Sequence, residues 1–239
     1  MNKLRQLQGA GVIESGGSWR ACRSAGGAVS AGQAPPASPD SSERHLHALP
    51  GRAAVDLDAA EAAARGLLTA LGADLETEGL RETPRRIAYA YAELLTPMPF
   101  NATTFPNDEG YDELVVVRDI PFQSLCMHHM LPFHGTAHVA YLPGDRIIGL
   151  SKLGRVVDLF ARDLQVQERL TTQVADWLDT ELAPRGVGVI IEAEHLCMSL
   201  RGAQKAGSRT VTSALRGSIK DDPRTRQEFL SLVHGHPIS

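Results

Sequence analysis

The segment SLCMHHMLPFHG, residues 124–135, places a thiol and an imidazole in C-x-x-H spacing at Cys126 and His129. Far downstream, the segment HLCMSLR at residues 195–201 supplies another histidine, a second thiol and an arginine. Thiolate sulfur and imidazole nitrogen are common ligands of Zn²⁺ in proteins. The two segments together predict one zinc centre that is assembled from distant parts of the chain.

An open coordination position is expected at this centre. A structural zinc site normally has four protein ligands, whereas a catalytic site keeps one position for water. The chain has three cysteines, and Cys22 falls in a stretch with the composition of a tail. The remaining candidates are three ligands, Cys126, His129 and Cys197, and two neighbouring histidines, His128 and His195. The alternative is a pair of ordinary core cysteines, because an isolated C-x-x-H is a weak pattern.

The composition excludes several classes of protein. The chain has 239 residues, a net charge of -4 and a pI near 6.1, so bulk charge does not indicate nucleic-acid binding. No apolar run approaches the roughly 20 residues that cross a bilayer, and the first residues lack the apolar core of a secretory signal. Three cysteines do not make a disulfide framework, so we expect a reducing, cytoplasmic compartment.

Two regions differ in composition. Residues 1–52 are rich in Gly, Ser, Ala and Pro, and such a stretch cannot bury enough apolar surface to order itself. We therefore expect a disordered tail followed by one domain over residues 53–239. Strands and helices mix in this domain without strict βαβ alternation, which predicts an α+β fold with an antiparallel sheet.

Apolar periodicity and turn residues locate the elements of this domain. Helices are predicted over 57–71 and 83–95, from 151, over about 170–182, and from 223. Strands are predicted over 113–118, 136–141, 146–149, 186–194 and 210–213. Between the second and third of these strands, Pro143-Gly144-Asp145 predicts a hairpin.

Two further groups of polar residues suggest a nucleotide. Ser151, Lys152 and Arg155 lie at the start of a predicted helix, where free amides, a hydroxyl and two cations suit a polyphosphate; an ordinary surface cluster is the alternative. Arg201 adds a cation near the metal. Glu168 is either a carboxylate that interacts with the dipole at a helix start or an acceptor for the N1–H and 2-amino group of guanine. The sequence pattern does not decide between these two roles.

Four blocks of the chain resemble the GTP cyclohydrolase I family. They are ETPRRIAYAY, SLCMHHMLPFHGTAHVAYLP, IIGLSKLGRVVDLFARDLQVQERLT and IEAEHLCMSLRGAQKAGSRTVTS. They stand in family order and cover most of residues 80–216. The resemblance implies a tunnelling fold (T-fold) with an N-terminal helical segment and an antiparallel sheet with helices packed on one face. It also implies a homodecamer of two pentamers whose sites lie between subunits.

The resemblance implies a role for each matching residue. The zinc ligands match Cys126, His129 and Cys197, and the catalytic residues match His128, His195 and Ser151. The phosphate-binding residues match Lys152, Arg155 and Arg201, and the guanine-recognising pair matches Gln167 and Glu168. The implied activity is zinc-dependent hydrolysis of GTP at C8, with release of formate and rearrangement to 7,8-dihydroneopterin triphosphate. This is the first step of tetrahydrofolate and pterin biosynthesis.

The chain departs from the family pattern at two positions. Met127 stands where the family usually has glutamate in Cys-Glu-His-His, and Asp163 stands at a usually basic position. Both changes could be tolerated drift. Alternatively, Met127 alters a proton transfer, and the enzyme is a divergent paralogue that stops at the ring-opened formamidopyrimidine or uses a modified purine nucleotide. A non-catalytic nucleotide-binding subunit is a further alternative.

Overall fold

The computed structural model describes residues 54–235. The expected tail over 1–52 lies outside the described residues, so its disorder and the boundary at residue 52 stay predictions. Residues 236–239, the end of the expected domain, also lie outside them. In the described part, no helix combines the length and the apolar character that crossing a bilayer requires.

Two helices precede the sheet. Helix α1 (Leu57–Ala70) begins after Asp56, whose carboxylate accepts a hydrogen bond from the backbone N–H of Ala59 at 2.9 Å. Helix α2 (Thr83–Leu95) packs against α1 and also contacts the first long strand of the sheet. Both helices were predicted from apolar spacing, and their bounds agree with that prediction to within one residue.

Five strands form the main sheet, in the order β5-β2-β3-β6-β7. They are β2 (Val115–Cys126), β3 (Pro132–Leu142), β5 (Leu164–Gln165), β6 (Gly186–His195) and β7 (Thr210–Arg216). The four long strands pair antiparallel, whereas the short β5 runs parallel to the end of β2. The α+β class is therefore confirmed, but the sheet is mixed where an antiparallel one was expected.

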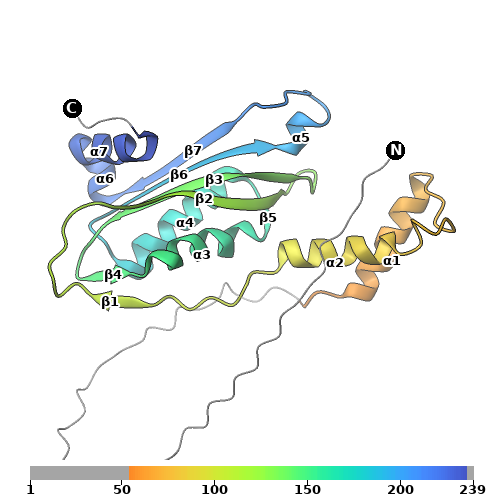
Figure 1. The fold of residues 1–239 in the computed structure, drawn as a ribbon, viewed down its shortest axis with the longest axis horizontal. Helices are drawn as coiled ribbons and strands as arrows, with labels where there is room; N and C mark the ends of the chain where they lie inside the picture. The colour runs from red at the N-terminus through yellow and green to blue at the C-terminus, as the bar shows by residue number, and fades with distance from the viewer. Residues whose placement is uncertain (1–53, 236–239) are drawn as a thin grey trace, which may run out of the picture. The chain divides into compact units, whose positions relative to one another are not determined.

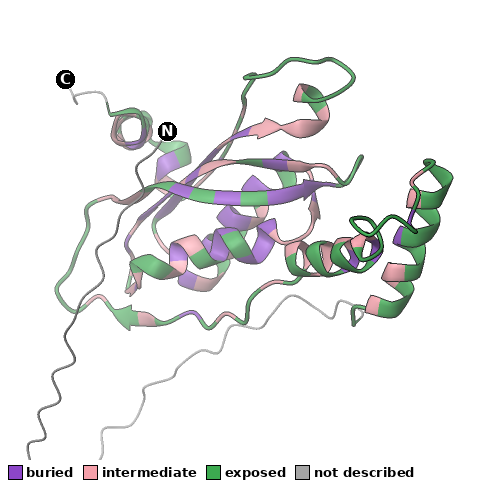
Figure 2. Cartoon of the chain, turned by 45° about the vertical axis from the view of Figure 1, so that its right-hand side comes forward, coloured by how far each residue is buried: buried purple, intermediate pink, exposed green. Residues whose placement is uncertain are grey.

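Helices cover both faces of this sheet (Figure 1), and not one face as the resemblance implied. Helices α3 (Leu150–Ala161) and α4 (Gln167–Leu182) pack on one face, over Val139, Val189 and Ile191. Figure 2 shows their buried residues gathered against the sheet. On the other face, Ala140 and Ile190 are buried with Phe229 of α7 (Pro223–His234) and with the short α6 (Gly217–Asp221). Alternate residues of a strand point to opposite faces, so β3 and β6 serve both cores.

The predicted hairpin around Pro143 is wrong. Strand β4 (Arg146–Ile148) pairs instead with β1 (Thr104–Pro106) in a separate two-stranded sheet. The reason is that β3 is already paired on both edges, with β2 on one side and β6 on the other. No free edge of β3 is left for the strand that follows the turn.

Strand β2 extends well beyond the predicted 113–118 and ends at the first metal-ligand candidate, Cys126. A register shift between Val117 and Ile120 marks a bulge, and Asp119 within it has a φ of 57°. The bulge breaks the alternation of apolar residues from which a strand is predicted. The sequence pattern therefore indicates only the first half of a strand whose second half delivers a site residue.

Gly135 should be intolerant of any side chain. A Cβ at this position of β3 would stand 1.9 Å from the carbonyl oxygen of Glu192 on the paired strand β6. We expect Gly135→Ala to cost about 3 kcal/mol or more of unfolding free energy, at the upper end of overpacking effects. Thermal unfolding would measure this cost. Gly66→Ala in α1, where a Cβ meets nothing within 4 Å, is the control and should be neutral or slightly stabilising; equal melting temperatures for the two variants would contradict the close approach.

Candidate metal centre

The C-x-x-H segment forms the tight turn that joins β2 to β3. The backbone N–H of Cys126 donates to the carbonyl of Leu131 at 2.9 Å, and the N–H of Met130 donates to the carbonyl of Cys126 at 2.8 Å. Met130 has a φ of 54°, which lets the chain reverse. His128 and His129 are therefore carried on a hydrogen-bonded turn directly after a buried strand end.

Two other elements hold this turn from outside. The backbone N–H of Met127 donates to the carbonyl of Gln165 in β5 at 2.9 Å. On the other side, the hydroxyl of Tyr91 in α2 donates to the carbonyl of Met130 at 3.2 Å. The position of the turn thus depends on backbone groups of its own residues and not on the side chain at position 127.

The second half of the centre arrives on β6. This strand ends at His195, opposite Phe133 in the antiparallel register with β3, and leads into the short helix α5 (Leu196–Ser199). Cys197 in α5 thereby comes to lie with its Sγ 4.0 Å from the Sγ of Cys126. One ligand atom from each of Cys126, Cys197 and His129 lies within 4.8 Å of the others.

This donor set fits a tetrahedral zinc ion. With Zn–S bonds of about 2.3 Å, two thiolates on a tetrahedron stand about 3.8 Å apart, close to the 4.0 Å between Cys126 and Cys197. Burial raises the pKa of the Cys197 thiol, and the neighbouring Cys126 raises it further. A divalent cation would offset both effects, because thiols bind metals as thiolates. The predicted ligands are thus brought together in an arrangement that could hold a metal.

A cavity of about 260 Å³ opens beside the three ligands. Its walls come from the turn, from the β5–α4 junction and from the end of β6 with its neighbours. The lining residues other than the three ligands are His128, Gln165, Val166, Gln167, Glu168, His195, Met198 and Thr210. Both predicted histidines and both members of the predicted guanine-recognising pair therefore face one space. His128 is exposed, with its Nδ1 3.8 Å from the Sγ of Cys126.

His195 is more constrained than His128. Its ring stacks on that of Phe133, with centroids 4.6 Å apart and an interplanar angle of 0°. Its Nε2 lies 2.8 Å from Oε1 of Gln167. Burial lowers the pKa of His195, and the nearby Glu168 partly opposes this shift. A half-buried imidazole held in this way is suited to proton transfer within the cavity.

Gln167 and Glu168 occupy different environments although they are adjacent. Both lie in the first turn of α4, because that helix starts at Gln167. The Gln167 side chain is buried, with 1% of the residue exposed, whereas Glu168 is exposed at the cavity wall. Only the Glu168 carboxylate is therefore presented to a ligand as an exposed charge.

The predicted phosphate-binding residues lie outside the cavity lining, three of them in the first turns of α3, whereas Arg201 is near enough to Cys197 for its charge to lower the pKa of that thiol. The cavity lining contains none of these residues, which are Ser151, Lys152, Arg155 and Arg201. The start of α3 lies at the end of the sheet opposite α5 (Figure 1). Ser151 is ten residues before Ala161, which is about 15 Å along a helix, and Ala161 lies near the metal end because its carbonyl accepts a hydrogen bond from Ser124 at 2.5 Å. Within one chain, the start of α3 with Ser151 and Lys152 therefore lies far from the candidate metal ligands, although a bound nucleotide would need both.

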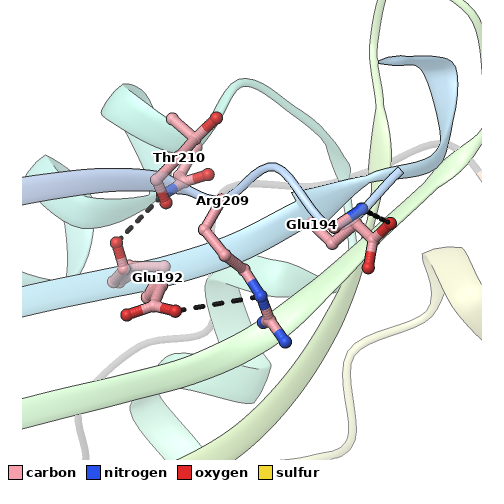
Figure 3. A network of polar contacts seen from close by, with 7 residues as sticks. Glu192, Glu194, Arg209 and Thr210 are labelled. Atoms are coloured by element: carbon pink, nitrogen blue, oxygen red, sulfur yellow. Dashed lines mark hydrogen bonds and ion pairs between the residues drawn. The ribbon is translucent and has the colours of Figure 1, made fainter. Parts of the chain in front are cut away.

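Arg201 lies in the loop that follows α5, and two glutamates of β6 tie this loop down (Figure 3). Oε1 of Glu194 accepts from the hydroxyl of Ser199 at 2.7 Å and from the backbone N–H of Gly207 at 3.3 Å. The first of these bonds is the main cause that lowers the pKa of Glu194. Glu192 and Arg209 form an ion pair at 3.8 Å. The loop is thereby anchored at its two ends.

The two departures from the family pattern differ in their surroundings. The side chain of Met127 is at the surface of the turn, and 44% of the residue is exposed. The Asp163 carboxylate accepts a hydrogen bond from the backbone N–H of Leu164 at 2.6 Å, at the start of β5. Asp163 therefore has a local structural role, whereas Met127 carries an exposed apolar side chain directly after the candidate ligand Cys126 and does not line the cavity.

Sequence reasoning overlooked several residues of this site. The cavity is also lined by Gln165, Val166, Met198 and Thr210. The ring of Phe133 stacks on that of His195. Each of these residues is close in sequence to a predicted residue or lies on a strand paired with one. Closeness to a predicted site residue could therefore have indicated these positions, but it does not say which neighbouring side chain points into the cavity.

The chain matches the family model described as GTP cyclohydrolase I over residues 60–234. It is 52% identical over 182 residues to GTP cyclohydrolase 1 of Aquifex aeolicus, across 76% of this chain and 99% of that protein. This chain belongs to the GTP cyclohydrolase I family.

Other members of the family are similarly close. GTP cyclohydrolase 1 of Deinococcus radiodurans is 53% identical over 176 residues, across 72% of this chain and 81% of that protein. GTP cyclohydrolase 1 of Mycolicibacterium vanbaalenii is 54% identical over 179 residues, across 73% of this chain and 89% of that protein. In each case the relative is matched over most of its own length.

Removing one thiol should release the metal without unfolding the chain. We expect Cys197→Ser to lower zinc bound per chain from about one to well under half, because the site loses one of three protein ligands. Elemental analysis of the purified protein would measure this, with circular dichroism to check the fold. Cys22→Ser is the matched control, since it removes the remaining cysteine and should leave the zinc content unchanged. Full zinc content in Cys197→Ser would disprove the ligand assignment.

Proposed function

We propose that the protein hydrolyses GTP at C8, releases formate and forms 7,8-dihydroneopterin triphosphate with the help of zinc. Family membership supports a hydrolase of the GTP cyclohydrolase I type. The observation that carries the proposal is the convergence of Cys126, His129 and Cys197 at the wall of a cavity that also contains two histidines and a carboxylate. The reaction would stand at the entry to tetrahydrofolate and pterin synthesis.

Cys126, His129 and Cys197 would hold the zinc ion, and three protein ligands would leave a fourth position for water. Zinc held there supplies a water molecule whose pKa is lowered towards neutrality. The cavity beside the ligands keeps this position accessible to a substrate. The thiols also need a reducing compartment, and this supports the proposed cytoplasmic location, since Cys126 and Cys197 are free thiols in the structure.

The histidines take the proton-transfer roles in this proposal. His195 protonates N7 of the purine as the imidazole ring of GTP opens, because imidazole exchanges protons near neutral pH. His128, exposed on the turn beside Cys126, assists opening of the ribose ring. Ser151 acts as a proton relay in the rearrangement that follows. Glu168 accepts hydrogen bonds from N1–H and the 2-amino group of guanine, since its carboxylate is exposed at the cavity wall.

A second copy of the chain completes the site. Lys152, Arg155 and Arg201 bind the triphosphate in this proposal, yet none of them lines the cavity of the same chain. Lys152 instead donates to the carbonyl of Asn101 at 2.7 Å, near the start of α3. We infer that α3 of a neighbouring subunit brings its cations to the cavity, as the family's T-fold decamer of two pentamers would allow.

The main alternative rests on Met127. A carboxylate at this place could orient water or pass a proton, whereas a thioether accepts hydrogen bonds only weakly and cannot pass a proton. The enzyme would then consume GTP or a modified purine nucleotide and stop at the ring-opened formamidopyrimidine. A nucleotide-binding subunit without turnover is the third possibility, and the complete donor set weighs against it.

Incubation of the zinc-loaded protein with GTP tests the proposal. We expect formate and, after oxidation, a fluorescent pterin in equal amounts, because both arise from each GTP. Formate can be measured enzymatically and pterin by its fluorescence. GTP consumption without pterin would support the early stop, and Met127→Glu should then restore pterin. Binding without any turnover would refute hydrolase activity.

Two inactive variants should complement each other if the site is shared between chains. Lys152→Ala removes a cation that binds the triphosphate, and Cys197→Ser removes a metal ligand. A homo-oligomer of either variant therefore has no intact site. Mixed oligomers formed by unfolding and refolding the two together should regain up to about a quarter of the wild-type activity, since random pairing unites two intact halves at that frequency. A mixture as inactive as its components would contradict the shared site.

A further inference from the structure

We propose that the side chain of Gln167 positions His195 and does not bind the guanine base. This inference rests on the proposed function, in which His195 transfers a proton to the purine. It differs from the role that the family resemblance implies for Gln167. Its basis is the set of hydrogen bonds that the buried side chain makes within the protein.

The nitrogen of the Gln167 amide is fully engaged. Nε2 lies 2.9 Å from the carbonyl oxygen of Ile191 in β6, 2.9 Å from the carbonyl oxygen of Thr210 in β7 and 3.1 Å from Oγ1 of Thr212. Two of these partners are backbone carbonyls, which only accept hydrogen bonds. The amide can therefore have only one orientation, with the NH₂ group towards the sheet.

The amide oxygen must then point to His195. Oε1 lies 2.8 Å from Nε2 of the ring. Since an amide oxygen only accepts, Nε2 must carry the hydrogen of this bond. The anchors in β6 and β7 thus fix the amide, and the amide in turn fixes which edge of the imidazole faces it.

Phe133 supplies the second restraint on His195. The two rings are parallel with centroids 4.6 Å apart, so the stack fixes the plane of the imidazole. The hydrogen bond to Gln167 fixes rotation within that plane. Two restraints from different elements, β3 and α4, together leave the ring one position at the cavity wall.

A base-binding role would need a free polar group on Gln167. Both hydrogens of Nε2 are shared among three acceptors, Oε1 accepts from His195, and 1% of the residue is exposed. To reach a base, the buried amide would have to give up its hydrogen bonds to Ile191, Thr210 and His195, which is costly. The adjacent Glu168 is exposed at the same wall and carries the charge that suits guanine.

Steady-state kinetics of two neighbouring variants test this division of roles. Gln167→Met keeps the size of the side chain but cannot hold the ring, so we expect kcat to fall about 10- to 100-fold with KM for GTP unchanged. Glu168→Gln should raise KM. The preference for GTP over inosine triphosphate, which lacks the 2-amino group, should stay the same in Gln167→Met. A raised KM together with a lost preference in Gln167→Met would overturn the proposal, as would an unchanged kcat.

Tyr141→Phe separates positioning from general destabilisation. Tyr141 is also buried, at 2% exposed, and its hydroxyl accepts a hydrogen bond from the backbone N–H of Ile148, away from the residues that line the cavity. With melting temperature and zinc content recorded for both variants, an equal loss of kcat in Tyr141→Phe would overturn the proposal. If Gln167→Met does not fold, Phe133→Leu removes the other restraint and should likewise lower kcat at constant KM; wild-type kcat there would overturn it. Absence of GTP turnover in the wild type would refute the proposed function instead.

Discussion

The antiparallel pairing of β3 with β6 is the interaction on which the candidate site depends. It sets Phe133 opposite His195, and from that pair each strand needs only a few residues to reach a cysteine ligand. The turn before β3 carries Cys126, and the short helix after β6 carries Cys197. A slip of one residue in this register would turn His195 to the other face of the sheet. At Gly135 the two strands approach so closely that a Cβ there would meet the carbonyl oxygen of Glu192.

The sequence predicted the structure best where apolar residues recur at helical spacing and where residue types suit a metal ion. Helices α1 to α4, the end of β6 and the grouping of Cys126, His129 and Cys197 were predictable, since helical apolar spacing is regular and few residue types suit zinc. The pairing of strands was less predictable from the sequence. The turn at Pro143 has hairpin chemistry, but a free edge of β3 was needed and both edges were taken. Local turn residues do not report which strand edges are occupied by distant parts of the chain.

The roles of residues within the site were also difficult to predict from the sequence. Gln167 and Glu168 are adjacent and polar, so a sequence pattern treats them as one pair. The fold separates them, because the amide of Gln167 is buried and bonded to the sheet and to His195, whereas Glu168 is exposed at the same cavity wall. Likewise, Ser151 and Lys152 looked like part of one nucleotide site with Cys126, and the length of α3 puts them at its far end. Such separations depend on helix phase and length in three dimensions.

The backbone anchoring of the metal turn has an evolutionary consequence. The hydroxyl of Tyr91 donates to the carbonyl of Met130, and the carbonyl of Gln165 accepts from the N–H of Met127, so neither contact uses the side chain at position 127. Natural selection can therefore explore that position without first rebuilding the coordination sphere. One exposed position next to a candidate ligand is thereby open to substitution while the backbone contacts of the turn stay in place, so altered chemistry could arise there in single steps.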